Sequence, residues 1–138
     1  MKNTMSGEWI DGMAFGTEVN GHELIMDADG SVGGQDRGPR PKPLMEAALM
    51  GCTAMDVISI LKKMRVEVDS FRIDIESELT EEHPKHYSHM HLIYRFKGKD
   101  LPMEKLEKAV NLSQDRYCGV SYIYRQAMKL THEIVIED

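Results

Sequence analysis

Hydrophobic and polar residues alternate with a spacing that changes along the chain, and each change predicts a new structural element. Over the first part, short apolar groups interrupted by glycines predict a hairpin of short strands, 8–15 and 17–26, with breaks at Gly12, Gly16 and Gly21. Residues 27–43 are rich in glycine and proline and predict a loop. A loop of this length in a compact domain is typically functional or mobile.

A long apolar segment then predicts a helix over 44–64, which Pro43 opens and the pair Lys62 and Lys63 closes. Its middle is apolar on every side, so protein must surround it. The rest of so short a chain can hardly enclose this helix if most of it forms one sheet. A homodimer that encloses the helix is therefore favoured over the alternative, in which a sheet and a second helix of the same chain cover it.

Beyond this helix, apolar residues recur at every second position. Segments 71–79 and 88–96 alternate between apolar and polar positions, which predicts two antiparallel strands in a long hairpin. An amphipathic helix over 102–113, a break at QDRYCG, a short helix over 120–128 and a last strand over 131–138 follow. The order predicts an α+β fold in a single domain, 1–138, built from N-terminal strands and loop (1–40), a central helix (41–65) and a C-terminal part (66–138).

The composition argues against several classes of protein. With 138 residues, 41% hydrophobic and 29% charged, the chain reads as one globular domain. A net charge of -6 without a run of Lys and Arg argues against nucleic acid as a partner. The longest weakly charged stretch, Ala47–Leu61, is interrupted by Asp56 and is too short to span a bilayer, and the N-terminus lacks a signal-peptide pattern. We therefore expect a cytoplasmic protein with no membrane contact.

Histidines, methionines and glycines predict no site. His89 and His91 project from one face of their strand, as zinc ligands can, but that face is polar and no further ligand at suitable spacing joins them. The methionines are scattered and suit core positions. The glycines of the loop form no phosphate-binding motif. The sequence therefore predicts neither a metal site nor a cofactor.

The two cysteines, Cys52 and Cys118, are either buried apolar residues or a reactive pair. Cys52 lies mid-helix, where burial and Asp56 raise the pKa of a thiol, so reactivity there requires a cation such as Arg37 or Arg40. Cys118 precedes a helix whose free backbone N–H groups favour a thiolate. This layout suits a pair in which one thiolate attacks a peroxide and the other resolves the sulfenic acid as a disulfide, and apolar walls favour an organic hydroperoxide.

Two motifs, GCTAMDV around Cys52 and RYCGVS around Cys118, resemble a known family. They lie in the longer runs RPKPLMEAALMGCTAMDVISILKKMRVEV, HPKHYSHMHLIYRFKGKDL and AVNLSQDRYCGVSYI. Together these resemble the osmotically inducible protein C and organic hydroperoxide resistance (OsmC/Ohr) family over residues 8–138, closest to the branch whose members read GCTAxDVVSILKK and KYCSVS. The resemblance implies an intertwined homodimer, with antiparallel sheets wrapped around the long central helices and two active sites at the subunit interface.

The resemblance also implies an activity. The better-known members are thiol-dependent peroxidases that reduce organic hydroperoxides in the oxidative-stress response, and a dithiol reductant regenerates them. Carried over by motif, Cys52 is the peroxidatic cysteine and Cys118 the resolving one. The family's activating arginine comes from an early strand or loop, which leaves Arg40 or Arg37 in this chain.

One position departs from the family pattern. In the peroxidase branches a glutamate follows the proline before the central helix and pairs with the activating arginine, whereas here Lys42 follows Pro41. The alternative prediction is therefore a non-catalytic OsmC-like protein that binds an apolar or thiol-reactive small molecule in the dimer cleft. A third is a protein whose cysteines are simply packed in the dimer core.

Overall fold

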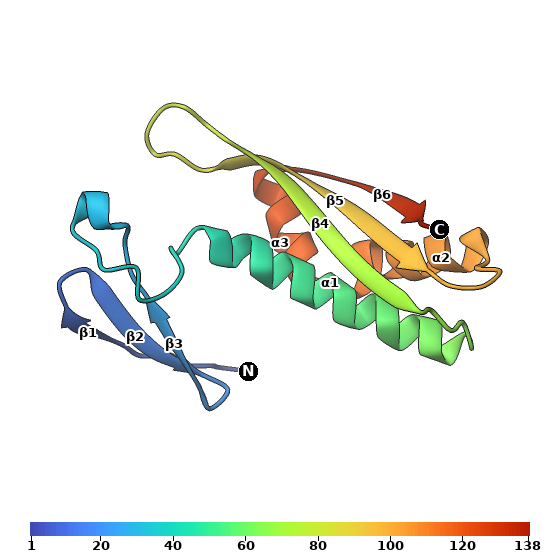
Figure 1. The fold of residues 1–138 in the computed structure, drawn as a ribbon, viewed down its shortest axis with the longest axis horizontal. Helices are drawn as coiled ribbons and strands as arrows, with labels where there is room; N and C mark the ends of the chain where they lie inside the picture. The colour runs from blue at the N-terminus through green and yellow to red at the C-terminus, as the bar shows by residue number, and fades with distance from the viewer. The chain divides into compact units, whose positions relative to one another are not determined.

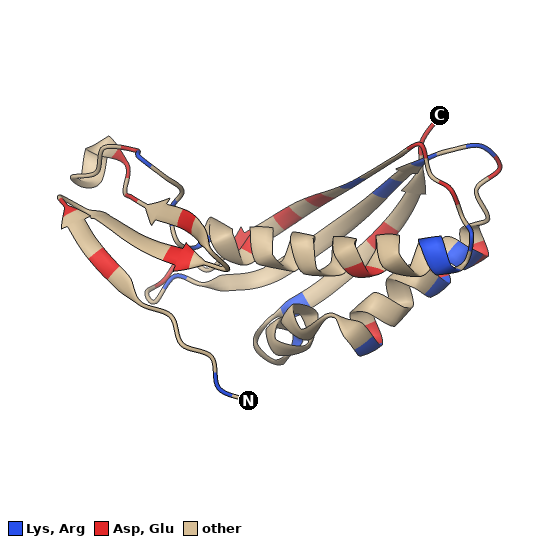
Figure 2. Cartoon of the chain, turned by 90° about the horizontal axis from the view of Figure 1, so that it is seen from below, with Lys and Arg blue, Asp and Glu red and all other residues tan.

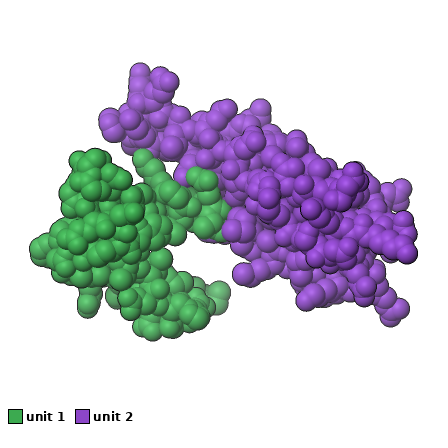
Figure 3. Space-filling view, in the orientation of Figure 1, with its two compact units in different colours: residues 1–47 green, residues 48–138 purple.

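A computed structural model describes all 138 residues, and the chain divides into two compact units, Met1–Ala47 and Ala48–Asp138 (Figure 3). Its elements are labelled in Figure 1. In chain order they are β1 (Gly7–Asp11), β2 (Ala14–Val19), β3 (His22–Met26), the 3-10 turn η1 (Gly30–Val32), α1 (Pro43–Lys63), β4 (Ser70–Leu79), β5 (Tyr87–Lys97), α2 (Met103–Leu112), the π-helical turn η2 (Ser113–Tyr117), α3 (Gly119–Ala127) and β6 (Lys129–Ile136). The predicted α+β class is confirmed. A single domain over 1–138 stays a prediction.

The first unit holds a three-stranded antiparallel sheet in the order β1-β2-β3, so the predicted short strands are present but the predicted break at Gly16 is wrong. Gly16 does not break the chain but pairs with Glu8 and Ile25 in the middle of β2. The turns lie at Gly12 and at Asn20–Gly21, where φ is 52°, 51° and 82°. The predicted breaks at Gly12 and Gly21 are therefore confirmed, and Asn-Gly favours a two-residue hairpin turn with both φ angles positive.

The loop between β3 and α1 is ordered around a buried carboxylate. Asp27 is 3% exposed and accepts hydrogen bonds from the backbone N–H groups of Ala28 (2.7 Å), Gln35 (3.2 Å) and Arg37 (3.2 Å). The Arg37 guanidinium donates to the same carboxylate at 3.1 Å and pairs with Asp11 at 2.7 Å. The predicted loop is therefore present, and Arg37 attaches it to β1.

We expect the variant Asp27→Asn to loosen this loop and to remove an acid-sensitive part of the stability. Burial opposes ionisation of Asp27, but the N–H donors around it lower its pKa to about 2. Because an aspartate in an unfolded chain titrates near about 4, the ionised carboxylate stabilises the fold at neutral pH, and this contribution is lost as the pH falls from about 4 to about 2.

Denaturant unfolding of wild type and variant, followed from neutral pH down to about pH 2, measures the effect. The exposed Glu18→Gln on β2 is the matched control and should behave as wild type. If the wild type and Asp27→Asn lost stability in parallel across this range, the assignment would be wrong.

The second unit holds a sheet in the order β4-β5-β6. β4 and β5 form the predicted long antiparallel hairpin, with Phe71 opposite Phe96. β6 runs parallel to β5, so the prediction of antiparallel sheets is right for five strands and wrong for the last one. The helical segments between β5 and β6 carry the chain back to the starting end of β5, and a parallel strand requires such a crossover.

One face of β5 forms the centre of the core, as the alternation predicts. Met90, Leu92, Tyr94 and Phe96 are fully buried on this face. They pack in one cluster with buried residues of two helices, Leu49, Val57 and Leu61 from α1 and Leu106, Ala109 and Val110 from α2. Helices and sheet therefore form two layers, with the helices on one face of the sheet (Figure 1).

The predicted central helix is confirmed as α1, but a single chain covers only one side of it. Leu49, Thr53, Val57 and Leu61 form its buried stripe. Met55 elsewhere on the helix is 75% exposed, and α1 is free of charge over most of its length (Figure 2). The uncovered surface agrees with the predicted need for further protein around this helix.

α1 also has the length and mean hydropathy (1.6) of a membrane-spanning helix. The expectation that no apolar segment is long enough to span a bilayer is therefore wrong, because α1 extends beyond Ala47–Leu61 at both ends. Its stripe of residues packed on the sheet is a feature of core helices. The absence of membrane contact stays a prediction.

Candidate active site

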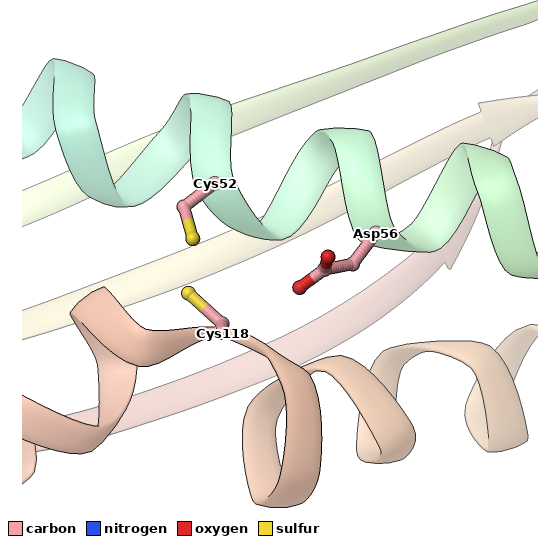
Figure 4. A group of neighbouring side chains, drawn as sticks. All are labelled: Cys52, Asp56 and Cys118. Atoms are coloured by element: carbon pink, nitrogen blue, oxygen red, sulfur yellow. The ribbon is translucent and has the colours of Figure 1, made fainter. Parts of the chain in front are cut away.

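The structure brings Cys52 and Cys118 together in the second unit (Figure 4). Their Sγ atoms and a carboxylate oxygen of Asp56 all lie within 4.8 Å of one another. Both cysteines are free thiols; Cys52 is half-buried and Cys118 is 3% exposed. The two cysteines, which are distant in sequence, thus lie close together as predicted, and the Asp56 carboxylate lies beside them.

Two helices position these side chains. Cys52 and Asp56 are four residues apart on α1, a spacing that places both on one face of the helix, and in Figure 4 they point toward Cys118. Cys118 is the N-cap of α3, where its Sγ accepts a hydrogen bond from the Ser121 backbone N–H at 3.3 Å. The predicted helix entrance at Cys118 is therefore confirmed.

The break before α3 is narrower than predicted. Instead of ending at QDRYCG, the helical path continues from α2 through η2, and only Cys118 departs from helical geometry, with φ -79° and ψ 100°. The Cys118 backbone N–H bonds back to the Ser113 carbonyl at 2.7 Å. This one-residue interruption places the sulfur opposite α1.

A buried hydrogen-bond network holds the Asp56 carboxylate. The Ser113 hydroxyl donates to Asp56 Oδ2 at 3.0 Å and is hydrogen-bonded to Thr53 Oγ1 at 2.8 Å. Thr53 Oγ1 lies 2.7 Å from the Tyr94 hydroxyl, which also accepts from Gln114 Nε2 at 2.6 Å. The network therefore joins α1, β5 and η2 behind the cysteines and fixes the orientation of Asp56.

The surroundings of Cys52 favour its neutral thiol. Burial raises the pKa of Cys52, the contact with Cys118 raises it further, the Val120 backbone N–H lowers it, and the negative charge of Asp56 raises it again. The predicted upward effect of burial and of Asp56 is confirmed. No lysine or arginine is among the main groups that act on this thiol. We therefore expect a further cation to be needed to favour the thiolate of Cys52.

Comparison with known proteins agrees with the geometry, since residues 33–133 match the family model described as OsmC-like protein. The chain belongs to the OsmC-like family. Protein YhfA of Escherichia coli (strain K12) is 34% identical over 126 residues, 91% of each chain. A crystal structure of a hypothetical protein from Aquifex aeolicus VF5 is 27% identical with a TM-score of 0.84, covering 100% of this chain and 99% of that one. The organic hydroperoxide resistance protein OhrB of Bacillus subtilis shares the fold, with a TM-score of 0.66 at 19% identity over 96% of this chain and 98% of that one.

The two arginines that the family pattern suggested are both engaged by carboxylates of the first unit. Arg37 is held by the buried Asp27 as well as by Asp11. Arg40 pairs with two exposed carboxylates, Asp36 at 2.6 Å and Asp29 at 3.5 Å. Activation of the thiolate by either arginine stays a prediction for this OsmC-like chain.

From the sequence, Asp56 is predicted only as a charge near Cys52, and the hydrogen-bond network around its carboxylate is not predicted. The four-residue spacing within GCTAMDV is the one local signal that places Asp56 beside the sulfur. Ser113 and Tyr94 lie on η2 and β5, far from this motif in sequence. No local pattern in the OsmC-like sequence joins them, because their meeting depends on how the helices pack on the sheet.

Proposed function

We propose that this protein is a thiol-dependent peroxidase of the oxidative-stress response that reduces organic hydroperoxides. Cys52 is the attacking cysteine and Cys118 the resolving one. The observation that carries the proposal is the approach of two free sulfurs to within 4.8 Å. Cys118 belongs to the apolar core cluster and Cys52 packs against it, and such surroundings favour an alkyl hydroperoxide over hydrogen peroxide. A cytoplasmic location, where thiols are kept reduced, fits a catalytic cycle that starts from two free thiols.

The reaction takes two steps. The Cys52 thiolate attacks the terminal peroxide oxygen, so that an S–O bond forms, the O–O bond breaks and the alkoxide takes a proton to leave as an alcohol. The Cys118 thiol then attacks the sulfur of the resulting sulfenic acid, which releases water and leaves a Cys52–Cys118 disulfide. A dithiol reductant returns both cysteines to thiols and is itself oxidised to a disulfide.

The test is a single-turnover titration. Fully reduced protein is mixed with one equivalent of cumene hydroperoxide, without a reductant, and analysed by intact mass and by peptide mapping under non-reducing conditions. We expect one equivalent of cumyl alcohol and an intramolecular Cys52–Cys118 disulfide with the loss of two hydrogens. Peroxide that remains unconsumed while both thiols stay free would overturn the proposal.

One observation favours the alternative function, a non-catalytic protein that binds an apolar or thiol-reactive small molecule. The raised pKa of Cys52 makes its thiol a poor nucleophile in the absence of a cation. In that case the titration above consumes no peroxide, while an apolar ligand binds saturably even when both thiols are replaced.

We also propose that the functional unit is a homodimer with the two sites at its interface, as is common for OsmC/Ohr proteins. Each unit exposes large apolar side chains that a monomer would leave in water. They include Trp9 (65% exposed) and Phe15 (47%) in the first unit and Met55 (75%), Tyr122 (62%) and Ile123 (62%) in the second. A second copy of the chain would cover α1, as its apolar surface requires.

Light scattering coupled to size exclusion should give a mass twice the 15.7 kDa of one chain. Met55→Glu places a charge on the uncovered side of α1 and should shift this mass toward that of a monomer, because burying the charge opposes association. Met103→Glu, on α2 and 37% exposed, is the matched control and should remain dimeric. A wild-type mass of one chain would refute the dimer.

A further inference from the structure

We propose that the reduced protein binds a thiophilic divalent cation, with zinc the best fit, through Cys52, Asp56 and Cys118. This site would hold the metal in place of peroxide, so that metal binding and thiol oxidation exclude each other. The binding itself does not depend on peroxidase activity; only its regulatory consequence rests on the proposed function.

The three side chains can take up the geometry of a zinc site after small shifts. In tetrahedral sites zinc lies about 2.3 Å from sulfur and about 2.0–2.2 Å from a carboxylate oxygen, which separates the ligand atoms by roughly 3.5–3.8 Å. The three ligand atoms already lie within 4.8 Å of one another, so side-chain shifts of about 1 Å complete the arrangement. Three protein ligands leave the fourth position to water.

The surrounding hydrogen bonds match those of a metal site. The Ser113 hydroxyl orients the Asp56 carboxylate, as the groups behind metal ligands commonly do. The Ser121 backbone N–H donates to the Cys118 sulfur, and the Val120 N–H acts on the Cys52 sulfur. Each of the three ligands thus has a donor that favours its anionic form.

A cation also explains the position of Asp56. A carboxylate next to two sulfurs opposes their ionisation, so it works against the nucleophile that peroxide reduction requires. With a divalent ion bound, two thiolates and one carboxylate become favourable neighbours. The carboxylate therefore has a function in the metal-bound form that it lacks in the peroxidase.

The ligand types select the class of ion. Thiolates favour zinc over magnesium and calcium, which prefer oxygen ligands, and the carboxylate favours zinc over the softer Cu(I). Binding releases the two thiol protons to solvent without any change in oxidation state. A Cys52–Cys118 disulfide contains no thiolate and cannot bind the ion.

Cobalt(II), a spectroscopic substitute for zinc, tests the site without any peroxide. Reduced, metal-free protein titrated with Co²⁺ should develop a thiolate-to-cobalt charge-transfer band and tetrahedral visible bands that saturate at one ion per chain and disappear on addition of Zn²⁺. Protein oxidised to the disulfide should show no such bands. Absence of the bands in reduced wild-type protein would overturn the proposal.

Variants assign the ligands. Cys52→Ser and Cys118→Ser should each lose the spectrum of the two-thiolate site, and Asp56→Asn should weaken Co²⁺ binding by more than tenfold, roughly the least that a lost ligand costs. Ser113→Ala should weaken Co²⁺ binding by about 10–100-fold, because the substitution removes the hydrogen bond that orients the Asp56 carboxylate. Asp115→Asn is the matched control: it removes a negative charge from an exposed position and should bind Co²⁺ as tightly as wild type. Equal spectra in Cys52→Ser and wild type would place the ion elsewhere and refute the assignment.

The metal titration and the peroxide titration can fail separately. Cobalt bands without peroxide consumption would refute the proposed function and leave the metal site standing. Disulfide formation with peroxide but no cobalt bands would refute the metal site and leave the peroxidase standing. If both hold, excess Zn²⁺ should slow disulfide formation in wild type, and a chelator should restore its rate.

Discussion

Replacement of Cys52 by serine is expected to abolish hydroperoxide reduction, with a fall in turnover of roughly three orders of magnitude, as expected when an enzyme loses its nucleophile. A serine hydroxyl is neither ionised near neutral pH nor oxidised by peroxides. Replacement of Cys118 is expected to have a different effect. In Cys118→Ser the first step still forms a sulfenic acid on Cys52, but no thiol remains within 4.8 Å to resolve it.

Two measurements separate these outcomes. Consumption of cumene hydroperoxide with excess dithiol gives the turnover of each variant, and a sulfenic acid trap followed by mass spectrometry shows where oxidation stops. We expect trapped sulfenic acid in Cys118→Ser and none in Cys52→Ser. Wild-type turnover in Cys52→Ser, or a trapped sulfenic acid on Cys118 rather than Cys52, would contradict the assigned roles.

Removal of the charge of Arg40 is expected to have the second largest effect on activity. Cys52 has no cation among the main groups that raise or lower its pKa, and the family resemblance suggests Arg40 or Arg37 as the activating cation. Arg40 leaves its carboxylate partners more easily than Arg37 does, because the partners of Arg40 are exposed and exposed ion pairs contribute little to stability. Arg37 is fixed by the buried Asp27. Loss of one opposite charge beside a thiolate lowers its reaction rate at neutral pH about tenfold or more.

The rate at which iodoacetamide alkylates Cys52, measured against pH, checks this. In Arg40→Ala the pKa of Cys52 should rise and the curve should move to higher pH, while Arg40→Lys retains most of the charge and should shift it less. Arg72→Ala, which removes an exposed arginine that pairs with Asp74 on β4, is the control and should leave the curve unchanged. A shift in Arg37→Ala but not in Arg40→Ala would assign activation to Arg37 instead.

Local patterns in the sequence were sufficient for most of the secondary structure. The continuous apolar run of α1, the alternation of β4 and β5 and the break at Cys118 each depend on the preferences of neighbouring residues, and each is present. The N-terminal strands were less well predicted, because breaks were expected at three glycines and only Gly12 and Gly21 make turns, while Gly16 lies within a strand. Glycine permits both conformations, so its position alone does not distinguish them.

The direction of β6 could not be predicted from its own residues. Alternation within a strand reports which face is buried but not which neighbour it pairs with or in which direction. Only the length and path of α2, η2 and α3 decide that the chain returns to the start of β5 before β6 begins. The parallel pairing is therefore a property of the whole second unit.

The sequence by itself determined most of the elements of this OsmC-like protein and the two cysteines of its family motifs, because helix and strand periodicity and the motifs GCTAMDV and RYCGVS are local features of the chain. Only the tertiary structure decided that the two sulfurs meet, that the Asp56 carboxylate joins them and that Ser113, Thr53 and Tyr94 hold it in place. The physical reason is that these contacts link residues about 40 to 66 positions apart, whose approach is set by packing of the helices on the sheet rather than by local preferences.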